Sequence, residues 1–440
     1  MIISKAVSYI TPINGTFFST SLRSRKTQET ISYLLKTSVL LIACCFTLFF
    51  YGCFGKILKP VPESPALVKL SSYEYPEFID DTYYDNLEEG IRQSLSYLNK
   101  RPRNIKFAFG QDLYETTHMV DSLVNFLEFI ENKPSANELK KHIDENYYVY
   151  KSTGTKGSGD VLFTGYYEPF LEGSLVKRDT YKYPVYGIPP DLISIDLSLF
   201  SPKYSGEKIT GRYTGQTVVP YYDRKEIETG GILDGKAPVL AWVNNPVDLF
   251  FLQIQGSGKI FLDNGETINV HYHAENGHSY KSIGNLLIQN QIIPPSEMSM
   301  QKIRAYLDSR PEAVQEILNY NPSYIFFKTE EDGPKGYLDV KLTPERSVAL
   351  DRRIFPLAGL VYIEAAKPVV SGNGAITGWT KNKKFVLNQD TGGAIRGPGR
   401  ADIFWGNGKY AETAAGNMKH KGCLYFLILK PESVLKPDNE

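Results

Sequence analysis

The chain has 440 residues, enough for two or three domains of ordinary size. Its 49 basic residues balance its 49 acidic ones, so no net charge favours nucleic acid as a partner, and a hydrophobic content of 42% excludes a disordered chain. Three of the four cysteines, Cys44, Cys45 and Cys53, share one apolar N-terminal stretch, which excludes a disulfide framework.

The N-terminal region is typical of an exported protein. Residues 39–51 form an apolar run after Lys36 that has the length of a signal-peptide core and is short for a membrane-spanning helix. The run ends in Phe50-Tyr51-Gly52-Cys53, which resembles a bacterial lipobox. We therefore predict a leader over residues 1–53 with Cys53 as the lipidation site, the alternative being an uncleaved membrane anchor. Three prolines mark residues 54–75 as a tether.

The segment that follows, residues 81–147, is predicted to be helical. Its second helix carries Val120, Leu123, Leu127 and Ile130 at steps of three and four residues, which gives the helix one apolar face. The next helix is predicted to open at Ser135, because a serine followed three residues later by a glutamate is the signature of a capping box.

From about residue 160 the sequence changes to short β-prone runs separated by glycine and proline. Between residues 249 and 273, turn signals at Gly256-Ser257-Gly258 and Asp263-Asn264-Gly265 separate three such runs, and we predict a β-meander. Helices are expected over residues 279–320, one of them starting near Pro311. Strands resume from there to the C-terminus, which predicts a closed barrel with few helices.

A histidine-rich stretch holds His271, His273, Glu275 and His278 within eight residues. The spacing fits none of the usual zinc patterns, so we predict no metal site and no cofactor. A polar strand end, a turn and a helix opening at Ser279 explain the stretch better. Ser257 lacks the spacing of a nucleophile elbow and Cys423 lies in an apolar strand, so neither predicts covalent catalysis.

The aspartates are more informative. Asp351, Asp390 and Asp402 each stand beside a strand-like run and a turn, and the glycine-rich residues 391–400 allow Asp390 and Asp402 to lie close together and raise one another's pKa. A carboxyl group that stays protonated near neutral pH can donate a proton to a leaving oxygen, as glycoside cleavage requires. Tyr166 and Trp405 could stack on sugar rings, although core packing explains each as well.

Several motifs around these residues resemble one known family. They are Gly165-Tyr166-Tyr167-Glu168-Pro169, Gln255-Gly256-Ser257-Gly258, the run from Asn276 to Gly284 and the run from Gln389 to Gly406. In this order they resemble the membrane-bound lytic murein transglycosylase A family, over residues 160 to 430. The resemblance implies a double-psi β-barrel built from residues 76–167 and 326–432, a second, barrel-like β domain inserted at residues 168–325, and a groove between the two for peptidoglycan.

The resemblance also implies a reaction and a set of roles. The family cleaves the bond from N-acetylmuramic acid to N-acetylglucosamine and closes a 1,6-anhydro ring, with Asp402 as acid and then base. Asp390 would tune Asp402, and Asp351 would stabilise a turn. The substrate-binding residues that it implies are Tyr166, Glu168, Gln255, Ser257, Tyr280, Gly392, Gly393 and Trp405.

Two other functions stay open on the sequence. One is an inverting glycoside hydrolase in which Asp390 or Glu168 activates water. The other is a non-catalytic peptidoglycan-binding protein. The implied partners are glycan strands, the membrane through Cys53 and an assembly for cell-wall synthesis, and we expect a monomer. Phe54 stands where inner-membrane lipoproteins carry aspartate, which favours the periplasmic face of an outer membrane over inner-membrane anchoring.

Overall fold

The computed structural model describes residues 65–372 and 374–433. The predicted leader, the lipidation site Cys53 and the first part of the tether lie outside these residues. Within the described part, no helix combines the length and the apolar character needed to cross a membrane.

Six strands close into a barrel in the order β19-β16-β17-β15-β18-β5, because β19 pairs with β5 as well as with β16. Beyond β19 the same sheet continues into β4 and then β1. This closed barrel confirms the mainly β fold class. The strands are β1 (Leu67–Lys69), β4 (Tyr147–Ser152), β5 (Val161–Glu168), β15 (Ser347–Ala349), β16 (Leu360–Val370), β17 (Ile376–Asp390), β18 (Arg400–Asn407) and β19 (His420–Leu429).

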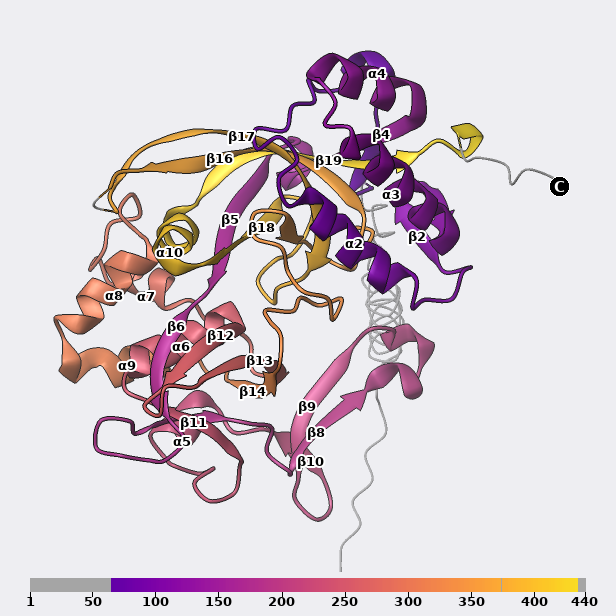
Figure 1. Ribbon diagram of the computed structural model, residues 1–440. Coiled ribbons are helices and arrows are strands. Elements are labelled where there is room, and N and C mark those ends of the chain that lie inside the picture. The colour runs from indigo at the N-terminus through magenta and orange to yellow at the C-terminus, as the bar shows by residue number, and fades with distance from the viewer. Residues whose placement is uncertain (1–64, 373, 434–440) are drawn as a thin grey trace, which may run out of the picture. The chain divides into compact units, whose positions relative to one another are not determined.

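Helices α2 (Leu87–Leu98), α3 (Thr116–Glu131) and α4 (Ala136–Asn146) precede β4 and share one hydrophobic core with the barrel (Figure 1). The apolar face predicted for α3 is confirmed, since its leucines and isoleucine are buried. The capping box at Ser135 is also confirmed. The segment is not helical throughout, because β2 (Lys106–Phe109) and β3 (Asp112–Glu115) form a hairpin between α2 and α3. Gly110, at a φ of 64°, makes the turn.

A second sheet is inserted between β5 and β15, with the strand order β14-β13-β12-β6-β11-β7. Gly187, just after β7, bridges to Phe327 of β14, so the sheet curves back on itself as the predicted barrel-like domain requires. β5 runs through Pro169 directly into β6 (Figure 1). The strands are β6 (Phe170–Ser174), β7 (Tyr183–Tyr186), β11 (Val239–Val243), β12 (Ser257–Leu262), β13 (Thr267–Glu275) and β14 (Ile325–Glu330).

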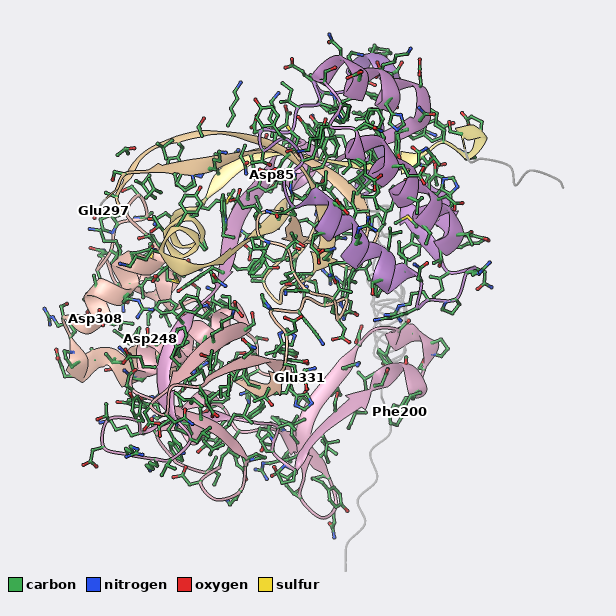
Figure 2. All side chains as sticks on the ribbon, viewed as in Figure 1. Asp85, Phe200, Asp248, Glu297, Asp308 and Glu331 are labelled. Atoms are coloured by element: carbon green, nitrogen blue, oxygen red, sulfur yellow. The ribbon has the colours of Figure 1, made fainter. Side chains whose placement is uncertain are left out.

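The inserted domain also carries a smaller sheet and several helices. The smaller sheet consists of β8 (Leu192–Asp196), β9 (Lys208–Tyr213) and β10 (Val218–Pro220). Figure 2 labels Phe200, an exposed side chain on the connection from β8 to β9. The helices are α5 (Arg224–Glu228), α6 (Pro246–Gln255), α7 (Ile283–Gln289), α8 (Met300–Asp308) and α9 (Val314–Asn319), and α10 (Gly408–Asn417) follows β18 in the barrel.

The predicted β-meander is wrong in its first strand, because residues 250–255 belong to α6. The side chain of Asn245 accepts hydrogen bonds from the amides of Val247 and Asp248, Pro246 takes the first helical position, and Gly256 ends the helix at a φ of 81°. An apolar run of this length cannot be assigned to helix or strand by periodicity. The other two strands and their turn are confirmed as β12 and β13. The later helices are confirmed too, although α7 begins after Ser282 rather than at Ser279.

A buried ion pair joins the N-terminal segment to the barrel. Both oxygens of Asp80 accept hydrogen bonds from Arg346, at 2.7 and 2.9 Å, and Arg346 also donates to the backbone carbonyl of Asp85. The backbone carbonyl of Arg346 accepts from the amide of Leu387 on β17. Residues 80–85 are therefore held against β17 and the start of β15.

Candidate active site

Asp390 and Asp402 lie on either side of the short strand β15. Ala349 of β15 is the register partner of Asp390 on β17 and of Asp402 on β18. Side chains at one register point to the same face of a sheet, and adjacent strands lie about 4.8 Å apart, which places the two aspartate Cα atoms about 10 Å apart. The two carboxylates share one face of the barrel, because they accept hydrogen bonds from Thr164 and Tyr166, two residues apart on β5.

Asp402 has the environment of an acid that exchanges its proton near neutral pH. Burial raises the pKa of Asp402 to about 6, against the lowering effects of a hydrogen bond from Thr164 and the charge of Arg400. The Thr164 hydroxyl on β5 donates to Oδ1 of Asp402 at 2.7 Å. Among the described residues no other group donates to Asp402, so Oδ2 is left for a substrate.

Asp390 is held much more tightly. Its Oδ2 accepts from the Tyr166 hydroxyl, and its Oδ1 accepts from the amides of Tyr337 and Thr391, each at 2.8 Å. Burial raises the pKa of Asp390, while these donors lower it. The upward direction that the sequence predicts for both aspartates is right. Burial, rather than mutual repulsion, is the main cause in each case.

Asp351 has a different electrostatic state. Burial raises its pKa, but hydrogen bonds from Arg353 and from the amide of Gly397 outweigh burial and lower the pKa to about 2. The guanidinium Nη2 of Arg353 lies 2.7 Å from Oδ2, and the Gly397 amide donates to the same oxygen at 2.8 Å. Asp351 is therefore charged near neutral pH and ties its own turn to the glycine-rich loop.

Two of the predicted substrate-binding residues sit where the barrel meets the inserted domain. Gln255, the last residue of α6, accepts a hydrogen bond from the amide of Tyr167 at 3.0 Å and so fastens α6 to β5. Glu168 is 1% exposed and accepts from Asn407 at 3.1 Å. It lies four residues beyond Thr164 on β5, or about 13 Å along the strand, so the structure does not bring it to Asp402.

The remaining predicted residues differ in exposure. Tyr280 is 45% exposed on the loop before α7, and a side chain on Gly393 would meet no atom, so both positions are open to a ligand. Gly392 is partly exposed next to Gly393, whereas Ser257 is buried at the start of β12.

Trp405 does not offer a face to a sugar, because it is 3% exposed and packs in the barrel core. Residues alternate between the two faces along a strand, so Trp405 points away from the face that carries Asp402. A Cβ atom on Gly165 would lie 2.4 Å from the indole nitrogen of Trp405, so this packing explains a glycine at position 165. The stacking role expected of Trp405 has no support in this geometry.

The histidine-rich stretch is dispersed. His271 stands opposite Lys328 on β14, and burial lowers its pKa to about 4, whereas Nε2 of His278 lies 2.7 Å from the carbonyl oxygen of Tyr221. In the described part of the chain, no group of three or more histidine, cysteine or acidic residues is arranged to hold a metal ion.

A cavity of about 530 Å³ lies where the barrel meets the inserted domain. It is lined by Tyr167, Phe170 and Leu171 at the passage from β5 to β6, by Asp248 and Arg304 from α6 and α8, and by Glu412 from α10. Figure 2 labels Asp248 on the inserted side of this cavity. Tyr167 and Glu168 at the end of β5 both line the cavity, whereas Tyr166 donates to Asp390 and is not among the lining residues.

Sequence reasoning missed two groups of the site. Thr164 precedes Tyr166 by two residues on a strand, so the alternation of side chains was a usable signal that both lie on one face. Tyr337 gave no signal, because it reaches Asp390 through a backbone amide in a loop.

The hydrogen bond from Thr164 predicts a shift in the pH profile. Replacing Thr164 by valine removes a donor that stabilises the Asp402 carboxylate, so the pKa of Asp402 should rise. If protonated Asp402 is the reactive form, kcat/KM falls as this group loses its proton, and we expect that fall to move up by about one pH unit. Thr164→Ser, which keeps the hydroxyl, should restore the wild-type profile. A Thr164→Val profile that overlies the wild type would show that this bond does not tune Asp402.

Two family models match the chain. The model of the MltA specific insert domain matches residues 162–328, and that of the 3D domain matches residues 346–428. The first span runs from within β5 to within β14, and the second contains Asp351, Asp390 and Asp402.

Relatives in sequence and solved structures agree with these models. The membrane-bound lytic murein transglycosylase A of Escherichia coli K12 is 33% identical over 286 residues, covering 64% of this chain and 70% of the relative, and that of Vibrio cholerae is 31% identical over 287 residues with the same coverage. The crystal structure of membrane-bound lytic murein transglycosylase from Agrobacterium tumefaciens has a TM-score of 0.67 and 29% identity, over 83% of this chain and 98% of that one. The structure of E. coli MltA with bound chitohexaose has a TM-score of 0.64 and 26% identity, over 84% and 96%. With this fold, these motifs and these relatives, the chain belongs to the membrane-bound lytic murein transglycosylase A family.

Proposed function

We propose that this protein is a peptidoglycan lytic transglycosylase that cleaves the β-1,4 bond from N-acetylmuramic acid to N-acetylglucosamine and leaves a 1,6-anhydro-muramic acid end. The observation that carries the proposal is the state of Asp402, a partly buried carboxyl group whose pKa is raised to about 6, with a single hydrogen-bond donor and one free oxygen. The E. coli relative crystallised with chitohexaose, an oligomer of β-1,4-linked N-acetylglucosamine, supports a glycan ligand for this face.

Asp402 serves twice in the proposed reaction. As an acid it protonates the glycosidic oxygen, and the bond from this oxygen to the anomeric carbon breaks. As a carboxylate it then takes the proton from the 6-hydroxyl of the same muramic acid, whose oxygen attacks the anomeric carbon and closes the anhydro ring. Asp402 ends protonated, as it began, and no water is consumed. The nucleophile is tethered to the substrate, so it has the high effective molarity of an intramolecular group.

Asp390 has a supporting role in this scheme. Three donors hold its carboxylate in one orientation on the same face as Asp402. A fixed negative charge at that place favours the positive charge that develops at the anomeric carbon. It also raises the pKa of Asp402, which keeps the acid protonated at higher pH.

The two other functions fit the site less well. An inverting hydrolase needs a second carboxylate that is about 6.5–9.5 Å from the acid and free to activate water. Asp390 has both oxygens engaged by donors, and Glu168 lies about 13 Å along the strand from Thr164. A protein that only binds glycans has no need of a buried carboxyl with a raised pKa, since burying that charge is unfavourable.

The mass of the products tests the proposal. The full-length protein in detergent is incubated with purified murein sacculi, and the released muropeptides are weighed by mass spectrometry. We expect products one water lighter than hydrolysis gives. Products with full-mass reducing ends would establish a hydrolase instead, and sacculus binding without any release would establish a binding protein.

Asp390→Asn is expected to lower kcat/KM by roughly 10- to 100-fold, less than a change of the acid itself, because it removes a supporting charge. Loss of that charge lowers the pKa of Asp402, so the falling limb of the pH profile moves to lower pH, opposite to the effect of Thr164→Val. The measurement is the pH profile of kcat/KM for Asp390→Asn and for Thr164→Val, which should shift in opposite directions. An Asp390→Asn profile that does not move would remove the tuning role.

We also propose that the protein is anchored by a lipid on Cys53 to the periplasmic face of the outer membrane and acts there as a monomer. The relatives named membrane-bound support attachment to a membrane. Metabolic labelling with a fatty acid should mark the wild type and not Cys53→Ser, and membrane fractionation distinguishes the outer from the inner membrane. Labelling of both forms would place the anchor elsewhere.

A further inference from the structure

Two exposed arginines, Arg352 and Arg396, lie next to the aspartates on segments that touch each other. Arg352 follows Asp351, and Arg396 precedes Gly397, whose amide donates to Asp351 at 2.8 Å. We call this pair the arginine rim. The carboxylate of Asp351 forms an ion pair with Arg353, so Asp351 does not neutralise the positive charge of the arginine rim.

Each guanidinium of the rim is held in place by neutral oxygens. Arg352 donates to the hydroxyl of Tyr337 at 2.7 Å and stacks over its ring at 4.9 Å. Arg396 donates to the backbone carbonyls of Gly392 and Ile395 at 3.0 and 3.2 Å. In the described part of the chain, neither forms an ion pair with a carboxylate. Their positions are thus set in advance, and their charges remain available to an anion.

The rim borders the active face. Arg352 contacts the side chain of Tyr337, and the backbone amide of Tyr337 donates a hydrogen bond to Asp390. Arg396 belongs to the loop that joins Asp390 to Asp402, and it lies close enough to the inserted domain for its charge to lower the pKa of Glu275 on β13, which burial raises. An anion bound by the rim would therefore sit beside a glycan on the two aspartates.

We propose that the arginine rim binds free carboxylates of the stem peptides that muramic acid carries, so that the enzyme prefers peptide-bearing glycan to bare glycan. This inference rests on the proposed function. The sugar rings of the glycan are uncharged, whereas stem peptides carry free carboxylates, which a planar guanidinium can bind through two parallel hydrogen bonds. Because the chain has no net charge, this attraction must come from local groups such as the rim.

The test compares two substrates that differ only in the peptide. Soluble uncross-linked glycan strands are used as they are, or after an amidase has removed their stem peptides. The double variant Arg352→Gln/Arg396→Gln should lose about three- to tenfold in kcat/KM on peptide-bearing strands, which is the loss expected from removing two exposed ion pairs. On bare strands its kcat/KM should change less than twofold. The wild-type preference should also fall as salt is added.

Binding supplies a readout that does not need turnover. In an Asp402→Asn background, the wild-type rim should bind peptide-bearing strands more tightly than bare ones, and the double variant should bind both alike. Arg310→Gln, an exposed arginine on the loop after α8, is the matched control and should change nothing. Arg352→Lys, which keeps the charge without the planar fork, should retain part of the preference.

Two results would overturn the inference. Equal losses on both substrates would mean that the rim shapes the site for sugar, and a double variant that keeps the wild-type preference would mean that the peptide is bound elsewhere. Failure of the proposed function looks different, because the wild type would then release no anhydro product from either substrate. The binding comparison would still decide the role of the rim.

Discussion

Replacing Asp402 by asparagine is expected to lower the rate of anhydro-muropeptide release by about 10³- to 10⁴-fold. The amide has the shape of the carboxyl group but cannot give a proton to the glycosidic oxygen or take one from the 6-hydroxyl. A positioned acid or base contributes about 10²- to 10⁴-fold, and one group that performs both steps should lie in the upper part of that range. Single-turnover rates on soluble glycan strands give the measurement.

The loss should not come from unfolding. Burial raises the pKa of Asp402 to about 6 from its usual value of 3.8, so the charged carboxylate opposes folding above that range. Asp402→Asn removes this charge and should unfold at or above the wild-type temperature at pH 7. Strand binding should persist, and Asp121→Asn, on the solvent face of α3, should keep full activity. Unimpaired turnover by Asp402→Asn would refute the assignment of the acid.

The wild-type pH profile follows from the same pKa. The reaction starts from protonated Asp402, so kcat/KM should be level at low pH and fall about tenfold per pH unit above roughly pH 6. A profile that rises through that range would mean that the reactive form of Asp402 is the carboxylate.

Local patterns allowed part of this fold to be predicted from the sequence. The face of α3 and the capping box of α4 are set by residues within four positions of each other, and both are confirmed. α6 was mistaken for a strand because its residues 246–253 are all buried or partly buried, which removes the periodicity that distinguishes a helix from a strand. The hairpin of β2 and β3 was missed, since each strand has only four residues.

In the active site, too, only features set by residues near one another in the chain could be predicted. The glycine-rich loop predicted that Asp390 and Asp402 could lie close together, because it joins them directly in the chain and can double back. The pairing order of strands β5, β18, β15 and β17 depends on tertiary contacts, which the sequence does not show. This order brings Thr164 to Asp402 and Tyr166 to Asp390. For the same reason the sequence could not show that Trp405 points into the core.

Asp80 and Arg346 are separated by 266 residues, and no pattern in the sequence pairs them. Both side chains are 1% exposed, and Arg346 also donates to the carbonyl of Phe385, next to β15. Asp80→Asn would leave the guanidinium buried without its counter-charge, which costs about 3–5 kcal/mol in the free energy of unfolding. Residues 347–349 follow Arg346 and separate Asp390 from Asp402, so activity should fall with stability in this variant.

The stability contributed by the ion pair of Asp80 with Arg346 should depend on pH. Burial raises the pKa of Asp80, but the hydrogen bonds and charge of Arg346 outweigh burial and hold the pKa below its usual value of 3.8. Its stabilising effect is therefore complete above about pH 3.8 and is lost as the pH falls through the lowered folded pKa. Denaturant unfolding of wild type and Asp80→Asn should show a gap that is constant near neutral pH and narrows in acid. Glu88→Gln, which breaks an exposed pair with Arg92, should cost less than about 1 kcal/mol. A similarly small cost for Asp80→Asn would mean that water reaches Arg346, and that the ion pair of Asp80 with Arg346 does not hold β15 in place.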